Sequence, residues 1–250
     1  MVVEIITGKV EIPLQGGGNM GGYLARPADG GARPAVLVFM EIFGINAHIR
    51  DVAERVAREG YVALAPDYFH RTGPGVEYGY DDAGLQAGMK LLGALKADEM
   101  IADANSAIAW LNQRPEVTKG RIAAMGFCVG GHMAYLSACE TSACCAASFY
   151  GGGIAAPAGP GGGESTIGRS SKIKGKILCL FGEKDGYIPR DEVDAIRRAL
   201  EDSEIEHEIA VYPGVDHGFF CDQRDSYQEE AARDAWERVK SLFALELAAP

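Results

Sequence analysis

Apolar runs rich in β-branched residues alternate along this chain with segments of helical period. The apolar runs lie at 35–40, 61–66, 121–127, 144–151, 176–182 and 207–214. The helical segments lie at 46–59, 98–113, 129–140, 189–202 and 225–246. Strands that are apolar throughout are buried on both sides, so they indicate a mostly parallel sheet with helices on both faces. The pattern therefore predicts an α/β fold.

Three segments fall outside this alternation. Residues 1–25 alternate weakly around a glycine run and predict an antiparallel hairpin at the sheet edge. Residues 69–88 form an irregular excursion before a helix, and residues 151–170 are rich in Gly, Pro, Ala and Ser, which predicts a long surface loop. Because the same alternation resumes after that loop, we expect a single domain over 1–250.

The charge balance narrows the possible partners. Asp and Glu number 35 against 24 Lys and Arg, a formal net charge of −11, and no block of basic residues occurs. Nucleic-acid binding depends largely on such residues, so we expect none. No apolar run has the length of a membrane span, and the first residues lack the pattern of a signal peptide. We expect a cytoplasmic protein without membrane association.

The six cysteines lie mostly in apolar runs and show neither a CxxC pair nor zinc-ligand spacing. In a reducing compartment they are thiols, and five of them are predicted to be small buried apolar residues. The sixth, Cys128, is the centre of the pattern "GFCVG". We expect no metal and no cofactor.

Residues that follow the strands are the functional candidates, because ligands of an open parallel sheet bind beyond the carboxyl ends of its strands. Cys128, Asp185 and His217 each occupy such a position, in the chain order nucleophile, acid, base. Gly126 and Gly130 leave room for a tight turn around the cysteine. Amides of the helix that starts at residue 129 would lower the pKa of the thiol. The pattern also fits a structural cysteine beside a glycine turn, and only its place between strand and helix favours a nucleophile.

The acid and the base each have an alternative interpretation. Asp185 could be a helix-entry residue, and Glu183 competes with it for the role of orienting the histidine. Asp185 is preferred because it lies past the turn at Gly182 and can reach back over the strand ends. His217 in "PGVDHGFF" could be a packed core residue, but it follows the last predicted strand, where a base is expected.

Four stretches together resemble the dienelactone hydrolase family, over almost the whole chain. They are "MEIFGINAHIRDVAERVAREGYVALAPD" at 40–67, "GFCVGG" at 126–131, "LFGEKD" at 180–185 and "HGFF" at 217–220. The resemblance implies an α/β-hydrolase fold, a triad of Cys128, His217 and Asp185, and cleavage of an ester or lactone through a thioester. It also implies an oxyanion hole of two backbone amides, those of Ile42 and Val129.

The resemblance assigns Glu41 as a gate for the thiol. Glu41 would accept a hydrogen bond from the resting thiol and swing away when substrate binds. An exposed loop acid is the alternative interpretation, but a carboxylate between Met40 and Ile42 is poorly solvated.

The chain departs from the family where a substrate carboxylate would be held. Founding members carry two arginines there, whereas residues 72–113 contain none and the position four after His217 is Cys221. The candidate substrate-binding residues are therefore Arg71, Tyr78 and Arg224, although solvated surface arginines are more common.

The expected function is cofactor-independent hydrolysis of a small ester or lactone by a monomer or small homo-oligomer. A carboxylesterase or thioesterase of broad acyl specificity with the same triad is one alternative. A non-catalytic protein that senses oxidants through Cys128 is another. Asp185 and His217 argue against the sensor, because a sensor thiol needs no oriented base.

Overall fold

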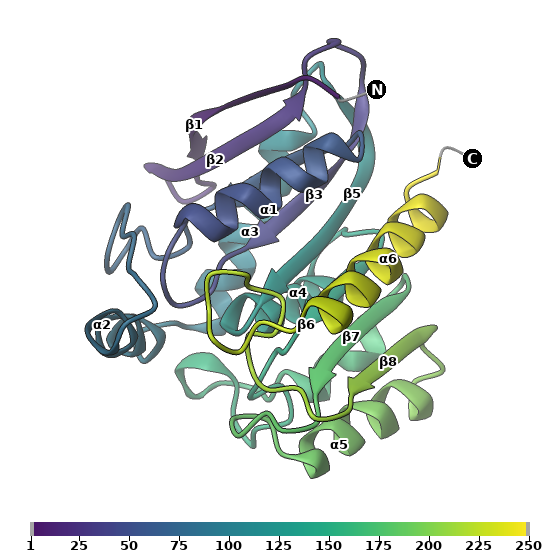
Figure 1. Cartoon of the computed structure of the whole chain (residues 1–250). Coiled ribbons are helices and arrows are strands. Elements are labelled where there is room, and N and C mark those ends of the chain that lie inside the picture. Colours follow the sequence, from purple (N-terminus) through teal and green to yellow (C-terminus); the bar gives the residue numbers. More distant parts are fainter. Residues whose placement is uncertain (1–2, 249–250) are drawn as a thin grey trace.

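The computed structural model describes residues 3–248, in which eight strands form one sheet (Figure 1). The strand order is β1-β2-β4-β3-β5-β6-β7-β8. The strands are β1 (Ile5–Pro13), β2 (Asn19–Pro27), β3 (Arg33–Phe39), β4 (Val62–Pro66), β5 (Val117–Phe127), β6 (Ala146–Phe149), β7 (Ile177–Gly182) and β8 (His207–Tyr212). Strands β3 to β8 run parallel, and the β1–β2 hairpin joins β4 in antiparallel pairing.

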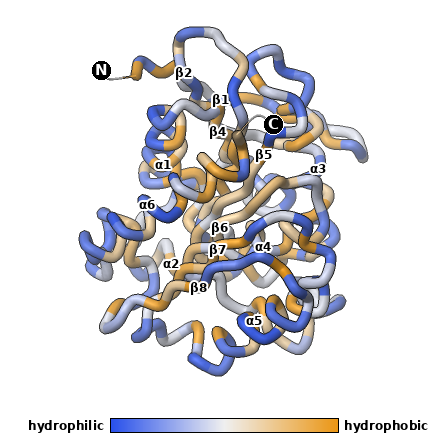
Figure 2. Tube along the Cα trace, turned by 90° about the vertical axis from the view of Figure 1, so that its right-hand side faces the viewer, coloured by the Kyte–Doolittle hydropathy of each residue, from blue (hydrophilic) through white to orange (hydrophobic). Residues whose placement is uncertain are grey.

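Helices cover both faces of the sheet, as predicted (Figure 2). One face carries α1 (Ala47–Arg58) and α6 (Glu229–Glu246), and the other carries α3 (Ala97–Leu111), α4 (Val129–Glu140) and α5 (Arg190–Asp202). Every residue of β4 and β7 is buried, and so are the last five residues of β3 and the last six of β5. The apolar runs of the sequence are therefore the core of the sheet, and its strand ends form one common edge.

One helix was not expected. Residues 69–88 were predicted to be irregular, but α2 spans Asp82–Leu92. The Asp81 side chain caps it by accepting from the Gly84 amide at 2.8 Å. Two glycines weaken its helical signal, yet Gly88 is required by packing, because a Cβ there would lie 2.5 Å from the carbonyl oxygen of Ile42. Helix α2 thus lies directly against the loop that follows β3.

The other two segments outside the strand-helix alternation have the structures predicted for them. The predicted edge hairpin is β1–β2, with β1 at the edge and β2 inside the sheet. The 151–170 segment is a loop with short 3₁₀ helices at Pro160–Gly162 and Ile167–Lys172. Helix α6 starts at Glu229, four residues later than expected, because a series of turns occupies the stretch after β8.

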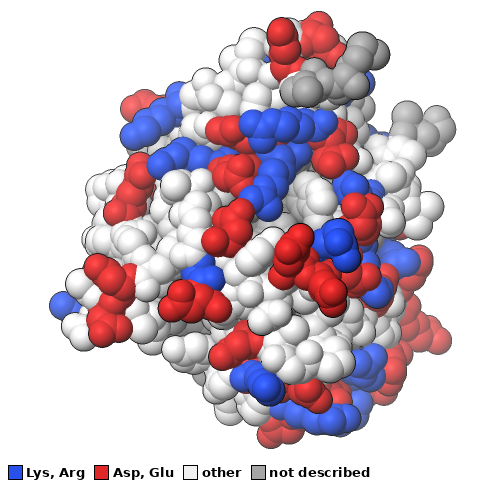
Figure 3. Space-filling model, in the orientation of Figure 1, with Lys and Arg blue, Asp and Glu red and all other residues white. Residues whose placement is uncertain are grey.

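Charged side chains of both signs are interspersed on the α1/α6 face (Figure 3). Arg55 pairs with Asp51 and Asp222, and Arg58 pairs with Glu54 at 2.9 Å. The basic residues of α1 are thus neutralised by neighbours. Among residues 3–248, every helix is too short or too polar to traverse a bilayer.

Candidate active site

Cys128 occupies a strained turn between β5 and α4. Its φ of 56° lies in the left-handed region, which a residue with a Cβ adopts only when its surroundings enforce it. The flanking glycines make that turn possible. A Cβ at Gly126 would lie 2.0 Å from the carbonyl oxygen of Gly130, and one at Gly130 would lie 2.3 Å from that of Phe39. The tight turn predicted around Cys128 is therefore present, and its geometry is set by the backbone and the two glycines. We refer to this turn as the elbow.

Hydrogen bonds hold the backbone of the elbow on both sides. The Cys128 amide donates to the carbonyl oxygen of Phe149 at 3.0 Å, and the Cys128 carbonyl accepts from Gly131 and His132. The sulfur therefore lies at the N-terminus of α4.

The loops after β7 and β8 bring Asp185 and His217 together. Asp185 Oδ2 lies 2.7 Å from His217 Nδ1, and both side chains are buried. Asp185 Oδ1 accepts from the Tyr187 amide at 2.9 Å, which fixes the carboxylate. With Nδ1 donating to the carboxylate, Nε2 is the nitrogen left for chemistry. The alternative acid, Glu183, is exposed and accepts from the Gly214 amide instead.

The environment of His217 favours the imidazolium. Burial disfavours the charged ring, but hydrogen bonds to Asp185 and Cys128 outweigh it and raise the pKa of His217 to about 10. At neutral pH the histidine is therefore protonated. A cationic imidazole beside the sulfur stabilises a thiolate.

Glu41 is fully buried, and its carboxylate is bound by two partners. Glu41 Oε2 accepts from the Tyr80 hydroxyl at 3.0 Å, and Oε1 accepts from Arg224 Nη1 at 3.1 Å. The Arg224 guanidinium also lies over the rings of Phe43 and Tyr80. No hydrogen bond joins Glu41 to the Cys128 thiol within residues 3–248. This conformation therefore differs from the thiol-bound one that the resemblance implies.

The other substrate-binding candidates lie elsewhere. Arg71 forms a bidentate pair with buried Asp103 at 2.6 and 2.8 Å, away from Cys128. Tyr78 contacts the loop after β3 through its backbone amide, which donates to Phe43. Tyr80, two residues further on, is the side chain that reaches Glu41 and was missed by the sequence analysis.

A cavity of about 470 Å³ opens above the thiol. Cys128, His217 and Arg224 line its polar end, together with Ile42 and Val129. The amides of Ile42 and Val129 donate no hydrogen bond to another group in the described part of the chain. Apolar side chains of α2, of Leu95 just after it and of the Gly/Pro-rich loop also line the cavity: Leu85, Met89, Leu92, Leu95, Ala156, Ala158 and Pro160. The site thus combines a reactive thiol with a largely apolar pocket.

His132 anchors the loop that closes this pocket. Its ring is buried on α4 and contacts the carbonyl oxygen of Gly152 at 2.9 Å and Thr166 Oγ1 at 2.7 Å. Burial lowers its pKa, so the ring is neutral. Both ring nitrogens are engaged in holding the 151–170 loop, so His132 has a positioning role.

Comparison with known proteins agrees with this geometry. The dienelactone hydrolase family matches residues 20–247. The chain belongs to this family. It is 46% identical over 247 residues to a Synechocystis protein named "Putative carboxymethylenebutenolidase", covering 99% of this chain and all of that one. It is 30% identical to the carboxymethylenebutenolidase of Pseudomonas sp. strain P51, covering 96% of this chain and 95% of that one.

Solved structures show the same likeness. A crystal structure from Klebsiella pneumoniae, titled as a "Putative Dienelactone Hydrolase", superposes with a TM-score of 0.85 at 36% identity, covering 96% of this chain and 99% of that chain. The fold is therefore the α/β-hydrolase fold predicted from the sequence. As a member of the dienelactone hydrolase family, the protein is a carboxylic ester hydrolase.

Proposed function

We propose that the protein hydrolyses an ester or lactone through an acyl-enzyme on Cys128. The observation that carries this proposal is the 2.7 Å contact of His217 with Asp185, in a cavity that Cys128 also lines from a strained elbow. An oriented base beside a thiol is the arrangement that nucleophilic acyl transfer needs. A thiol that only senses oxidants needs no oriented base, so this contact argues against the redox-sensor interpretation.

The proposed reaction begins once substrate is bound, Glu41 points away from the sulfur and Cys128 is a thiolate. The Cys128 thiolate attacks the carbonyl carbon, and the oxyanion is held by the amides of Ile42 and Val129. The His217 imidazolium then gives its Nε2 proton to the leaving alkoxide, which leaves a thioester on Cys128. Neutral His217 takes a proton from water, and the resulting hydroxide attacks the thioester. Collapse releases the acid and restores the thiolate and the imidazolium.

We infer that Glu41 controls the thiol by exchanging partners. In the conformation described above, its two oxygens are bonded to Tyr80 and Arg224. A turn of this buried carboxylate toward the sulfur would replace the bond from Arg224 by one from the thiol. Cys128 would then be restrained in the absence of substrate.

The lining of the pocket supports broad acyl specificity. Arg224 is the arginine on the cavity wall, and Glu41 already neutralises it. Apolar side chains of α2 also line the cavity, with Leu85 and Met89 partly exposed to solvent. Short neutral esters and lactones therefore suit the site at least as well as a carboxylated lactone.

A substrate panel tests the proposal. Wild type, Cys128→Ser and Cys128→Ala are compared on neutral lactones, p-nitrophenyl esters and a carboxylated lactone. We expect activity of the wild type on several of these and none of Cys128→Ala. An alanine variant with wild-type rates would refute the cysteine mechanism, and a wild type inactive on every ester and lactone would refute the reaction class.

We propose a cytoplasmic location, because the six cysteines lie mostly in apolar runs without the spacing of a disulfide framework. That the protein is a monomer or a small homo-oligomer also remains a prediction. A disulfide found between any two of these cysteines in the isolated native protein would argue against this location.

A further inference from the structure

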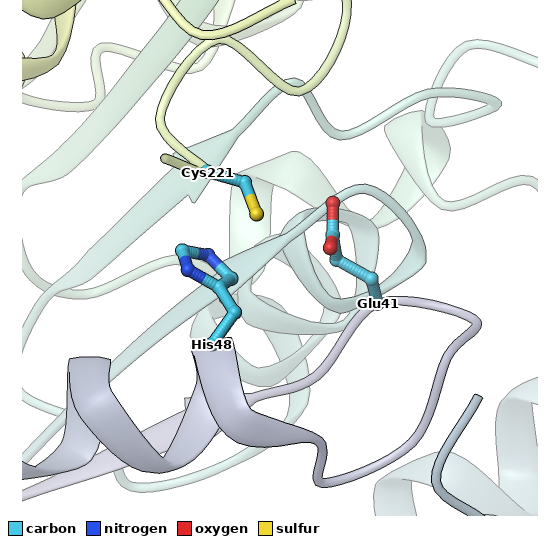
Figure 4. Close-up of side chains that lie close together, drawn as sticks. All are labelled: Glu41, His48 and Cys221. Atoms are coloured by element: carbon cyan, nitrogen blue, oxygen red, sulfur yellow. The ribbon is translucent and has the colours of Figure 1, made fainter. Parts of the chain in front are cut away.

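A second group of reactive side chains lies behind the catalytic site. Glu41 follows β3, His48 lies in the first turn of α1, and Cys221 lies in the turns between β8 and α6. All three are fully buried, and one ligand-type atom of each lies within 4.8 Å of the others. Figure 4 shows the three side chains pointing toward one another. Residues remote in the sequence thus converge on one small volume.

His48 is the unusual member of this group. Neither of its ring nitrogens has a hydrogen-bond partner in the described chain, although the side chain is fully buried. The ring is held edge-on by Phe127 and Phe220, with centroids 5.7 and 6.3 Å away. Buried polar groups nearly always have partners, so an orphaned imidazole indicates a missing one.

The missing partner must suit a carboxylate, an imidazole and a thiol together. Glu41 accepts two hydrogen bonds, whereas a carboxylate has about four acceptor positions, so it has capacity left on both oxygens. A neutral imidazole is a common metal ligand, and both ring nitrogens of His48 are free to bind in the described chain. Carboxylate, neutral imidazole and thiolate form a donor set typical of Zn²⁺, whereas Mg²⁺ and Ca²⁺ prefer oxygen alone.

We propose that Glu41, His48 and Cys221 bind a thiophilic divalent transition-metal ion of the zinc class, at a site separate from the triad. A tetrahedral ion bonded at about 2.0–2.3 Å holds its ligand atoms roughly 3.3–3.8 Å apart. The three ligand atoms are within 4.8 Å of one another, so shifts on the order of 1 Å complete the geometry. The ion supplies the partner that His48 lacks.

Charge at the site is compatible with a cation. Glu41 and an ionised Cys221 contribute two negative charges, and Arg224 contributes one positive charge through its bond to Glu41. In the metal-free protein Arg224 neutralises the buried carboxylate. A metal-bound thiolate has lost its proton, so binding by Cys221 releases a proton and strengthens as pH rises.

Metal binding should also affect the proposed hydrolysis. This effect, unlike metal binding itself, rests on the proposed function. An ion draws the Glu41 carboxylate toward His48 and weakens its bond to Arg224, which lines the substrate cavity. Glu41 also precedes Ile42, whose amide we assign to the oxyanion hole. The bound ion therefore keeps Glu41 from turning toward the Cys128 thiol.

Co²⁺ serves as a spectroscopic probe for the Zn²⁺ site. The titration uses Cys128→Ser protein, because this change removes the thiolate–imidazole pair that could bind metal at the triad. We expect about one equivalent of Co²⁺ and a thiolate charge-transfer band in the near ultraviolet. Cys221→Ser and His48→Gln, made in the same background, should weaken binding by at least about 100-fold, since even outer-shell changes cost up to that factor.

Cys179 provides the matched control. It is as buried as Cys221, but it belongs to no Glu, His and Cys group of this kind among residues 3–248. Cys179→Ser should bind Co²⁺ like the Cys128→Ser parent. Absence of the band, or a band that survives both Cys221→Ser and His48→Gln, overturns the proposal.

A second measurement avoids changing the site at all, in case its variants fold poorly. Slow alkylation of Cys128→Ser protein is followed for each cysteine by peptide mass spectrometry, with and without Zn²⁺. Bound Zn²⁺ should slow modification of Cys221 at least tenfold and leave Cys179 unchanged. Equal rates at Cys221 with and without Zn²⁺ overturn the metal site. Neither experiment requires hydrolysis, so failure here leaves the proposed function standing.

Discussion

Replacing Asp185 with Asn probes the pair on which the proposed chemistry depends. The amide keeps the shape of the side chain but removes the charge that His217 Nδ1 contacts at 2.7 Å. Removing one partner of a buried ion pair costs about 3–5 kcal/mol. If that whole loss appears in the transition state, then at about 1.4 kcal/mol for each factor of ten kcat/KM should fall about 10²- to 4 × 10³-fold. A loss near the lower end is expected, because a thiolate needs less help from its base than a serine does.

The assay compares p-nitrophenyl acetate hydrolysis by wild type, Asp185→Asn and Glu183→Gln. Glu183 is the matched control, because it is a nearby carboxylate that faces solvent and contacts Gly214 rather than His217. Glu183→Gln should retain wild-type kcat/KM. A value for Asp185→Asn within threefold of wild type, or a larger loss in Glu183→Gln, would refute the assignment of Asp185.

The same pair predicts how stability depends on pH. The pKa of His217 is raised from 6.5 to about 10 in the folded protein, so the charged ring favours the folded state. This contribution is complete below about pH 6.5 and is lost as pH rises through about 10. The difference in free energy of unfolding between wild type and Asp185→Asn should therefore shrink from pH 6 to pH 10, measured by urea denaturation. A difference that grows over this range would contradict the stated pKa.

Three further changes test the surroundings of the triad. Gly126→Ala places a Cβ 2.0 Å from a neighbouring carbonyl oxygen, so it should destabilise the fold by about 1–3 kcal/mol and lower Tm by about 2–12 °C. The control is Gly163→Ala, whose Cβ would have nothing within 4 Å, and it should leave Tm unchanged. Glu41→Ala should speed alkylation of Cys128 by iodoacetamide, and an unchanged or slower rate would disprove the gate. Glu41 neutralises Arg224, so Arg224 should contribute little to anion binding. The kcat/KM for a carboxylated lactone should therefore not exceed that for a neutral ester of similar size. A strong preference for the carboxylated lactone that is lost in Arg224→Ala would contradict this prediction.

The sequence was sufficient to predict the sheet, and it also placed the three residues of the proposed triad at strand ends. Consecutive apolar residues identify the buried strands, and Cys128, Asp185 and His217 follow strands whose carboxyl ends share one edge. These are local patterns, so a single sequence contains them. The close contact between Gly126 and Gly130 is likewise local, whereas the contact of Gly130 with Phe39 depends on the fold.

Contacts between side chains that are far apart in the sequence could not be predicted, because local patterns do not record them. Tyr80 reaches Glu41 across 39 residues from an irregular stretch, so nothing local distinguishes it from Tyr78. Arg71 and Arg224 look alike as surface arginines, and only the fold shows that Arg71 is occupied by Asp103.

Helix α2 was missed for a related reason. Its glycines lower helix propensity, and the tertiary contact that requires Gly88 lies on another element. Its first residues therefore seemed to belong to the irregular excursion, although Leu85 and Met89 line the cavity. The apolar wall of the pocket could not be predicted without this helix.

The most direct test of the account is to trap the intermediate. A slowly hydrolysed p-nitrophenyl ester is mixed with the protein, the reaction is quenched in acid within the first turnover, and the intact mass and peptides are measured. The account predicts one acyl group per chain, attached to Cys128 as a thioester and absent from Cys128→Ala. An acyl group on another residue, or full hydrolysis without any adduct and with an active Cys128→Ala, would contradict it.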